Sequence, residues 1–366
     1  MKTILVTGGA GFIGSNFVKH LYTKYPQYRI IVIDSLTYAG SVQNCPEGAF
    51  GSDRYEFWYG DVRNGELINN LISQSDVVVH MAAESHVTRS IYDNRLFFET
   101  DVIGTQTVAN AVAKHKDRVE RFIHISTSEV YGTAESALMD ENHPLNPMSP
   151  YAAAKCGADR LVYSYYQTYQ IPAIIIRPFN NFGPYQHLEK AVPRFITSCI
   201  LGEPMTVHGS GSAARDWLFV GDHCAALDRA IHAELDKVVG EVINLGTGID
   251  RSVAEVARAV QKIVREQRQQ LLSVGGGRRK TDLALKRGEP LESEIEFVGD
   301  RPGQVFRHTC DASKAKRLLG WEPETSFEDG LKHTFNWYQE HQNWWQPQMW
   351  MRHIPIVTAA GKKEMH

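Results

Sequence analysis

The sequence predicts an α/β fold in which a doubly wound parallel sheet is joined to a smaller C-terminal substrate-binding lobe. Short β-branched runs in the first half alternate with longer segments whose apolar residues recur every three or four positions. This order builds a parallel sheet with helices on both faces. After Pro178 the rhythm loosens, because prolines interrupt the elements that follow. Such elements suit a lobe that covers the carboxyl edge of the sheet and receives a ligand.

The predicted strands are runs of four or five residues rich in β-branched or aromatic side chains. Helices are expected at residues 94–114 and 149–169, where the apolar positions have helical spacing. The predicted strands are residues 3–7, 29–33, 55–59, 77–80, 121–125, 173–176 and, further along the chain, 242–245.

The loss of this rhythm suggests where one part of the chain ends and the next begins. We expect residues 1–178 to form the first domain, and the chain to re-enter it near residues 210–250. Residues 179–344 then form mainly the substrate-binding lobe, and residues 345–366 a tail.

Two segments of the second half have no assigned role. Residues 268–290 show no periodicity and are predicted to be a surface loop. The tail carries Trp345 and Trp350, so we expect it to pack on the body of the protein or to meet a second subunit.

The composition excludes several classes of function. With 39 Lys and Arg against 42 Asp and Glu, the 366-residue chain has a formal charge of −3, which gives no basic footprint for nucleic acid or an anionic membrane. The five cysteines are far apart and lack a Cys-x-x-Cys pair, so neither a disulfide framework nor a metal site is predicted. No signal peptide or membrane span is indicated. We therefore expect a cytoplasmic protein that acts on a small molecule.

A glycine-rich turn directly follows the first predicted strand. Gly8, Gly11 and Gly14 satisfy G-x-x-G-x-x-G, and Gly9 completes G-x-G-x-x-G. Glycine allows a tight turn and a close approach of the backbone, so a pyrophosphate can sit at the N-terminus of the next helix. Asp34 follows Gly14 by twenty residues, where a carboxylate binds the adenosine ribose and repels a 2′-phosphate. The pattern predicts a Rossmann site in the first domain that binds NAD in preference to NADP.

Further contacts to the cofactor are predicted at the start of the first helix and after the next strands. The ends of parallel strands meet at one edge of the sheet, where an aspartate can hold the adenine and small side chains leave room for the dinucleotide. These positions are Phe12, Ile13, Ser35, Leu36, Thr37, Asp61, Val62, Ala82 and Ala83.

A candidate acid–base pair lies at the start of the second predicted helix. Tyr151 and Lys155 are four positions apart and so share one helix face. An ammonium group beside a phenol favours the phenolate, and we therefore expect Lys155 to lower the pKa of Tyr151. The phenolate can take a hydroxyl proton as a hydride leaves the same carbon. We expect both residues, Lys155 included, to contact the cofactor as well.

The segments T-G-G-A-G-F-I-G, S-T-S-E-V-Y-G and Y-A-A-A-K resemble the motifs of the extended short-chain dehydrogenase/reductase family. Within it, longer stretches from residue 3 to about Trp321 resemble the dTDP-glucose 4,6-dehydratases. The resemblance implies NAD that is retained through the reaction, a nucleotide-sugar substrate and a homodimer. The stretches are residues 33–40, 82–87, 180–185, 189–190, 215–220 and 300–303.

The resemblance also assigns catalytic roles. Tyr151 would take the O4 proton of the sugar while a hydride passes from C4 to NAD⁺, and Thr127 would hydrogen-bond O4. Glu129 would then remove the C5 proton, which the 4-keto group acidifies. Water would leave from C6 and the hydride would return there, giving a 4-keto-6-deoxy sugar without consuming the cofactor.

Substrate-binding residues are expected mainly in the lobe. Arginines suit the diphosphate because a guanidinium binds phosphate oxygens in a bidentate manner, although surface ion pairs are their alternative role. His86 would face the sugar, with a structural histidine as the alternative. The residues that the resemblance indicates for the substrate are His86, Asn180, Asn181, Lys190, Arg215 and Arg301.

Three positions depart from the dTDP-glucose 4,6-dehydratases. Ser128 stands where those enzymes have the Asp that protonates the departing C6 hydroxyl, and serine is too weak an acid for that task. Thr88 replaces Asp, and Asp101 replaces Asn. Thr-Ser-Glu also occurs in GDP-mannose 4,6-dehydratases, so dehydration remains the predicted reaction. UDP-glucuronate decarboxylase, nucleotide-sugar 4-epimerase and a non-catalytic dinucleotide-binding protein remain the alternatives.

Overall fold

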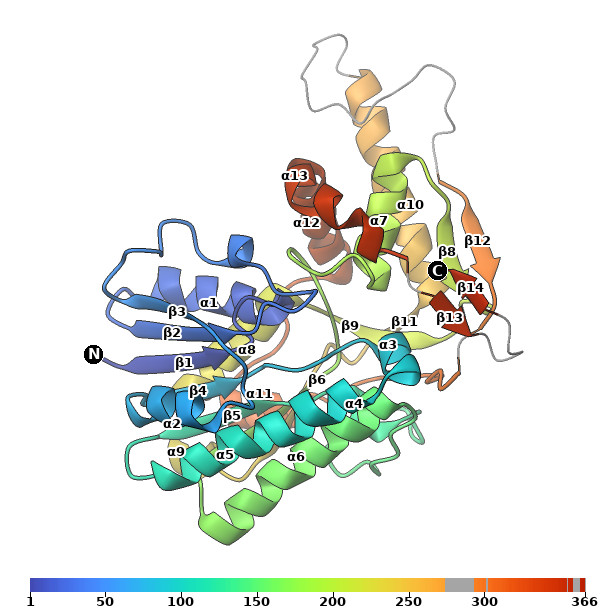
Figure 1. Ribbon diagram of the computed structural model, residues 1–366. Coiled ribbons are helices and arrows are strands. Elements are labelled where there is room, and N and C mark those ends of the chain that lie inside the picture. Colours follow the sequence, from blue (N-terminus) through green and yellow to red (C-terminus); the bar gives the residue numbers. More distant parts are fainter. Residues whose placement is uncertain (274–292, 301, 354, 358–362, 366) are drawn as a thin grey trace.

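A parallel sheet of seven strands forms the centre of the larger part of the protein, which confirms the predicted fold class (Figure 1). The computed structural model describes residues 1–273, 293–300, 302–353, 355–357 and 363–365. The strand order is β10-β6-β5-β4-β1-β2-β3, so the order of the chain reverses between β1 and β4. The strands are β1 (Thr3–Thr7), β2 (Arg29–Asp34), β3 (Tyr55–Tyr59), β4 (Val77–His80), β5 (Arg121–Ile125), β6 (Ala173–Pro178) and β10 (Val242–Leu245).

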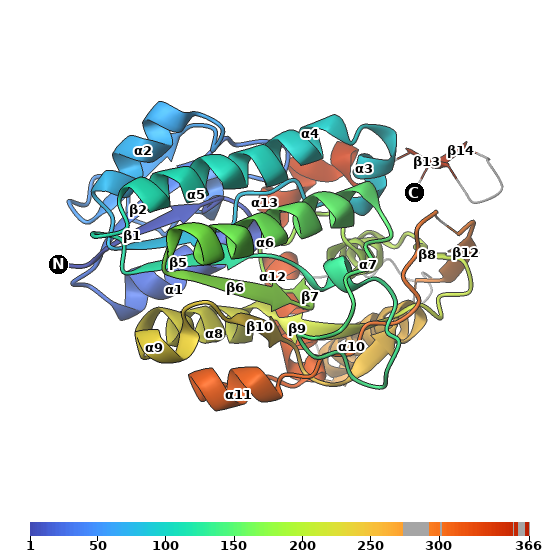
Figure 2. The same ribbon diagram turned by 90° about the horizontal axis from the view of Figure 1, so that it is seen from below.

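Helices cover both faces of this sheet, as Figure 2 shows from below. Along β1, Ile4 and Val6 pack into the core on one face, and Leu5 packs into the core on the other. The central strands β1 and β4 are buried on both faces, which explains why they are apolar runs rich in Val, Ile and Leu. One face carries α1 (Phe12–Lys24), α8 (Val220–His232) and α11 (Ser313–Leu319), and the other carries α2 (Gly65–Ser73), α5 (Thr105–Lys114) and α6 (Pro150–Tyr169).

The helix predicted over residues 94–114 differs from a regular α-helix. It is divided into α4 (Arg95–Phe97), a π-helical segment η2 (Phe98–Gly104) and α5. The wider turns of η2 place the Asp101 carboxylate inside the protein, where it accepts a backbone hydrogen bond from Glu84. The remaining short elements around the large sheet are η1 (Val42–Asn44), α3 (Val87–Tyr92), η3 (Ser128–Tyr131) and α9 (Leu235–Val238).

The lobe has its own core of helices beside a two-stranded sheet (Figure 1). A three-stranded sheet, β11-β9-β7, lies between this core and the large sheet. The elements are β7 (Asn180–Phe182), α7 (Ala191–Leu201), β8 (Met205–His208), β9 (Ala214–Phe219), β11 (Asp250–Ser252), α10 (Val253–Ser273), β12 (Ile295–Val298), α12 (Phe327–Glu340) and α13 (Gln342–Trp345).

The structure corrects one expectation about the unassigned segments. Residues 268–273 belong to the end of α10, which runs from Val253 to Ser273, and are not a loop. The rest of the predicted loop lies outside the described residues.

In the tail, Trp345 is buried and donates its indole N–H to the Tyr338 carbonyl at 2.8 Å, while Trp350 is exposed. The tail also contains η4 (Gln346–Met351) and the antiparallel pair β13 (Pro355–Val357) and β14 (Lys363–Met365). Within the described ranges, no helix has both the length and the apolar character needed to cross a bilayer.

Candidate active site

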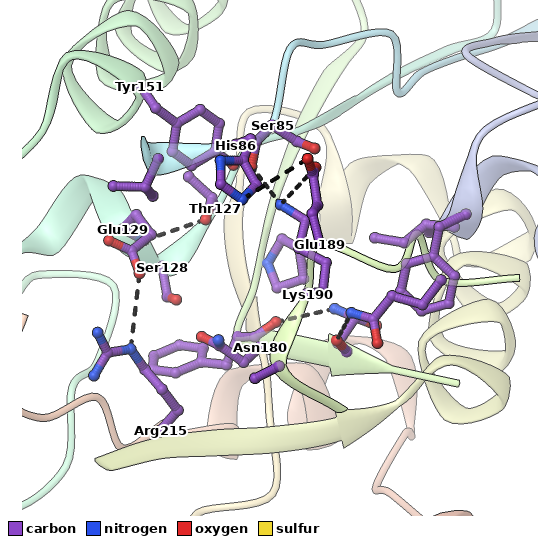
Figure 3. Close-up of a pocket in the computed structure, with 18 of the residues that line it drawn as sticks. Ser85, His86, Thr127, Ser128, Glu129, Tyr151, Asn180, Glu189, Lys190 and Arg215 are labelled. Carbon is purple, nitrogen blue, oxygen red and sulfur yellow. Dashed lines mark hydrogen bonds and ion pairs between the residues drawn. The ribbon is translucent and has the colours of Figure 1, made fainter. Parts of the chain in front are cut away.

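A cavity of about 370 Å³ lies between the carboxyl edge of the large sheet and the lobe. Its walls come from the ends of β5 and β6, the start of α6 and the lobe (Figure 3). Ligands bind at this edge of parallel sheets because the loops after the strands converge there. The predicted site residues that line the cavity are Phe12, Ile13, Ala83, His86, Thr127, Ser128, Glu129, Tyr151, Lys155, Asn180, Asn181, Lys190 and Arg215.

The turn between β1 and α1 forms an anion cradle. Gly8 has a φ of +69°, and a Cβ at this position would lie 2.8 Å from the backbone of Ala82. A Cβ at Gly14 would overlap the Gly8 carbonyl oxygen. Helix α1 starts at Phe12 with no side-chain cap and no acidic residue in its first turn, so its amides and dipole favour an anion. The turn therefore fits the pyrophosphate of NAD.

Asp34 ties this turn to the loop after β2. One carboxylate oxygen accepts the Ala10 N–H at 2.9 Å, and the other accepts the Leu36 N–H at 2.8 Å. The second bond holds Leu36 at a φ of +49°, in the left-handed region. Burial raises the pKa of Asp34, while both backbone bonds lower it. Asp34, Ser35, Leu36 and Thr37 thus lie at the strand end where the adenosine ribose is expected.

The end of β3 is less open to a ligand than the sequence suggests. The Asp61 carboxylate pairs with the Arg63 guanidinium at 2.7 Å, and this pairing lowers the pKa of Asp61. Arg63 also pairs with Glu99 at 2.8 Å. Val62 is buried beside this network. Any contact between Asp61 and the adenine therefore competes with an existing ion pair.

Thr127 and Glu129 stand side by side on the cavity wall after β5. The Thr127 hydroxyl accepts the Glu129 N–H at 3.2 Å and so caps the short helix η3. Oε1 of Glu129 lies 3.8 Å from Nε of Arg215, which β9 brings from the other side (Figure 3). The guanidinium offsets part of the carboxylate charge at this point of the cavity.

The start of α6 delivers Tyr151 and Lys155 to the same wall. The Ser149 hydroxyl caps this helix by accepting the Ala152 N–H at 3.1 Å, and Pro150 occupies its first position. Nζ of Lys155 is buried and donates to the Ile125 carbonyl at 2.7 Å. The structure thus places the predicted pair within one turn of helix beside η3.

The expectation of a lowered pKa for Tyr151 is wrong, because its pKa is raised. Burial raises the pKa of Tyr151 most, and the charges of Asp101 and Glu129 raise it further, whereas a hydrogen bond with Thr127 lowers it. Burial also lowers the pKa of Lys155. The reason is that the buried cavity wall already lies near two carboxylates, Asp101 and Glu129, which disfavour the negative charge of a Tyr151 phenolate.

Two buried carboxyl groups, Asp101 and Glu84, belong to this electrostatic environment. Asp101 on η2 is 1% exposed and accepts the Glu84 N–H on Oδ1 at 2.8 Å. Its Oδ2 has no hydrogen-bond partner among the described residues. Burial raises the pKa of each carboxyl to about 7, and the positive charge of Lys155 lowers that of Asp101. In the sequence, Asp101 stands out only because the dTDP-glucose 4,6-dehydratases have Asn at this position.

Ser128 is oriented by a histidine that sequence reasoning missed. Its hydroxyl lies 3.3 Å from Nδ1 of His308, and Nε2 of His308 lies 2.7 Å from the Gly132 carbonyl oxygen. A carbonyl only accepts, which assigns the imidazole proton to Nε2 and makes Nδ1 an acceptor. Ser128 therefore donates to His308. Burial lowers the pKa of His308 to about 4, so the ring is neutral at pH 7.

His86 and Lys190 lie around the buried Glu189 (Figure 3). Nδ1 of His86 caps α3 by accepting the Arg89 N–H at 3.2 Å, and its Nε2 lies 3.8 Å from the Glu189 carboxylate. Arg89 donates to the same carboxylate at 3.0 Å. Lys190 donates to the Ser85 carbonyl at 2.7 Å. The two predicted substrate residues thus also take part in a structural network.

The remaining predicted substrate residues have different surroundings. Asn180 lies on the cavity wall. The Asn181 side chain donates to the Phe179 carbonyl at 2.9 Å and contacts Nδ1 of His223 at 2.9 Å, which indicates a structural role. Arg301 lies outside the described residues.

Two buried arginines of the cavity, Arg194 and Arg352, were also missed. Arg194 lies on α7 and Arg352 follows η4, and no local pattern shows that these segments meet. In the described ranges, no group of three or more His, Cys, Asp or Glu side chains is arranged to hold a metal ion.

Comparison with known proteins gives consistent matches over nearly the whole chain. The family model described as GDP-mannose 4,6 dehydratase matches residues 5–334. The low-salt glycan biosynthesis protein Agl12 of Haloferax volcanii is 44% identical over 335 residues, which cover 92% of this chain and 98% of that protein. A dTDP-glucose 4,6-dehydratase of Xanthomonas campestris pv. campestris is 40% identical over 356 residues, which cover 94% and 95%. The crystal structure of DesIV, the dTDP-glucose 4,6-dehydratase of Streptomyces venezuelae, with NAD bound is similar with a TM-score of 0.81 and 37% identity, and the match covers 94% of this chain and 99% of that one.

Proposed function

Because the chain belongs to the GDP-mannose 4,6-dehydratase family and is an NAD-dependent nucleotide-sugar 4,6-dehydratase, we propose that Tyr151, Lys155 and Glu129 carry its chemistry. The observation that supports this proposal most directly is the shared cavity wall. It presents a phenol, an ammonium group and a carboxylate from two neighbouring elements, η3 and α6. This set can take one proton from oxygen and another from carbon.

In the first step Tyr151 takes the proton of the sugar O4, and Thr127 holds that oxygen. When bound, NAD⁺ would supply the hydride acceptor for C4 and the hydride donor for C6. The cradle at Gly8 and the uncapped start of α1 would hold its pyrophosphate, and Asp34 its ribose. Lys155, buried and bonded to Ile125, contributes an ammonium group that favours the Tyr151 phenolate once the proton leaves.

In the second step Glu129 removes the C5 proton that the 4-keto group acidifies, the C6–O bond breaks, and the hydroxyl leaves as water. Arg215 stays near the carboxylate and limits its movement. Ser128 contributes orientation, since its own proton is committed to His308. We propose that Lys190 and Arg215 also bind the nucleotide part of the substrate, where cations suit the phosphates.

One experiment tests the reaction class. The purified protein is incubated with dTDP-glucose, UDP-glucose, UDP-GlcNAc, GDP-mannose and UDP-glucuronate, and each product is weighed by mass spectrometry. Loss of one water from a hexose supports the proposal. Loss of carbon dioxide from UDP-glucuronate indicates a decarboxylase, a product of unchanged mass and altered retention indicates an epimerase, and no change with any of them indicates a non-catalytic binder.

We also propose that the protein is a cytoplasmic homodimer. Apolar side chains of η2 and α6 lie exposed on the outer surface of the sheet's helical layer, and Ile103, Tyr163 and Tyr169 are among them. A second copy that covers them removes this apolar area from water. The five cysteines are free thiols, which suits a reducing compartment. Light scattering coupled to size-exclusion chromatography measures the mass, and a monomer at micromolar concentration contradicts the dimer.

Replacing Asp34 by Ala is expected to narrow the preference for NAD over NADP. The carboxylate lies at the end of β2, where a 2′-phosphate would meet a like charge. The variant also loses the bonds to Ala10 and Leu36, so its affinity for NAD should fall as well. Titration of both cofactors into parent and variant measures the ratio. A ratio that stays the same would show that another residue discriminates.

Replacing Ser128 by Ala is expected to slow turnover by less than tenfold, about the worth of one neutral hydrogen bond. The serine hydroxyl donates to His308 and is therefore not the acid of the elimination. Steady-state rates of the variant and of His308→Gln should fall together. A loss above a hundredfold in Ser128→Ala alone would contradict this role.

Replacing Asp101 by Asn is expected to move the pH dependence of the first step to lower pH. Asp101 ionises at about pH 7, and its charge raises the pKa of Tyr151. Asn carries no charge at any pH, so above about pH 7 the phenolate forms more readily and NADH appears faster than in the parent. Below about pH 7, where Asp101 is protonated, the two rates should converge. Single-turnover rates between pH 5 and about 9 measure the shift. Asp76→Asn is the matched control, because Asp76 also accepts a backbone N–H but at the opposite edge of the sheet. Identical profiles for Asp101→Asn and the parent would contradict the prediction.

A further inference from the structure

Two arginines on the lobe side of the cavity have no part in the chemistry described so far. Arg194 lies in α7 and is 8% exposed. Arg352 comes from the tail, directly after η4, and is 2% exposed. Both line the cavity. A buried charge is costly unless an opposite charge pairs with it, so each of these arginines is expected to have an anionic partner.

The protein itself neutralises them only in part. Arg194 donates to the Thr206 hydroxyl at 2.5 Å, and it makes no ion pair with any carboxylate of the described residues. Arg352 pairs with Glu203 at 2.5 Å and donates to Ser198. Its Nε is buried and has no hydrogen-bond partner in the described part of the chain.

The two guanidinium groups also repel one another. Burial, and to a smaller extent the charge of Arg352, lowers the pKa of Arg194 to about 10, so Arg194 remains charged at neutral pH. Two buried positive charges in one cavity wall destabilise the ligand-free protein. An anion bound between or beside them reduces this repulsion.

The start of α7 adds a second attraction for an anion. This helix has eleven residues, and its first turn contains Arg194 but no acidic side chain. Lys190 precedes it without capping it. The first amides and the dipole of α7 thus favour negative charge at the same place as Arg194.

We propose that Arg194, Arg352 and the N-terminus of α7 form a subsite for a phosphate-type oxyanion, so that the C-terminal tail completes the ligand cavity. The inference rests on the proposed function for the identity of the substrate, whose diphosphate is one source of such an anion. Free phosphate is the other source. Charge-assisted hydrogen bonds from two guanidinium groups suit both.

The test measures binding without chemistry. Inorganic pyrophosphate is titrated calorimetrically into the parent and into Arg194→Met. The variant is expected to bind it about ten- to a hundredfold more weakly, the worth of one charge-assisted bond, and Arg194→Lys less weakly than that. The free Arg194→Met protein should also melt at a higher temperature, because a buried unpaired charge is gone. Arg251→Met is the control, since Arg251 pairs with Glu328 in the same lobe.

A competition experiment between pyrophosphate and a nucleoside diphosphate identifies the source of the anion. If a nucleoside diphosphate displaces pyrophosphate, the subsite serves the substrate, and if both bind together, it serves free phosphate. Pyrophosphate affinity within twofold of the parent in both Arg194→Met and Arg352→Gln would overturn the subsite. Failure of the proposed function has a different signature: the parent binds pyrophosphate but releases no water from any nucleotide sugar.

Discussion

Replacing Tyr151 by Phe is expected to slow the formation of NADH from bound NAD⁺ and nucleotide sugar by about 10²–10⁴-fold, the usual contribution of a general base. The substitution removes one oxygen and keeps the ring. The Tyr151 backbone N–H bond to Ser90 at 3.1 Å and the ring contact with Phe97 remain, so the fold and the affinity for substrate should be retained. Single-turnover absorbance measures the rate, and calorimetry measures binding.

Tyr28→Phe provides the control, because Tyr28 precedes β2 at the opposite edge of the sheet from the cavity and its hydroxyl contacts His232. It should keep the parental rate. NADH formation at the parental rate in Tyr151→Phe would mean that another group takes the O4 proton, and the cavity wall would then have to be reinterpreted around Glu129 or Lys155.

Most of the fold was predictable because its main signals are local. The central strands β1 and β4 are buried on both faces and so appear as apolar runs rich in Val, Ile and Leu. The turn at Gly8 was predictable because only glycine tolerates its φ and its contact with Ala82. The π-helical η2 was not, since the Glu84 N–H that Asp101 of η2 accepts lies 17 residues away in the sequence.

The candidate site was predictable where one motif contains its residues. The motifs are short: one spans Thr127 to Glu129 and the other Tyr151 to Lys155. The contact of Ser128 with His308 joins positions 180 residues apart, and no sequence pattern in either segment indicates it. The predicted direction of the Tyr151 pKa shift was wrong for the same reason. Burial and the charge of Asp101 depend on the folded arrangement and not on sequence spacing.

Replacing Glu129 by Gln is expected to separate the two chemical steps. The oxidation at C4 needs no carboxylate, and it should become easier, because the charge of Glu129 raises the pKa of Tyr151. Removal of the C5 proton should slow by about 10²–10⁴-fold, since an amide is not a base at neutral pH. NADH should therefore accumulate on the enzyme, and C5–H should exchange with D₂O far more slowly than in the parent.

Glu135→Gln is the control, because Glu135 is an exposed carboxylate that follows η3 and contacts Asn146. It should neither accumulate NADH nor slow the exchange. If Glu129→Gln turned over normally, or if Ser128→Ala were the more damaging change, the base of the elimination would be misassigned. A Glu129→Gln enzyme that formed no NADH would instead show that Glu129 acts before Tyr151, through its pairing with Arg215 and the shape of the cavity wall. Accumulated NADH together with slow exchange is the combination that assigns Glu129 to C5.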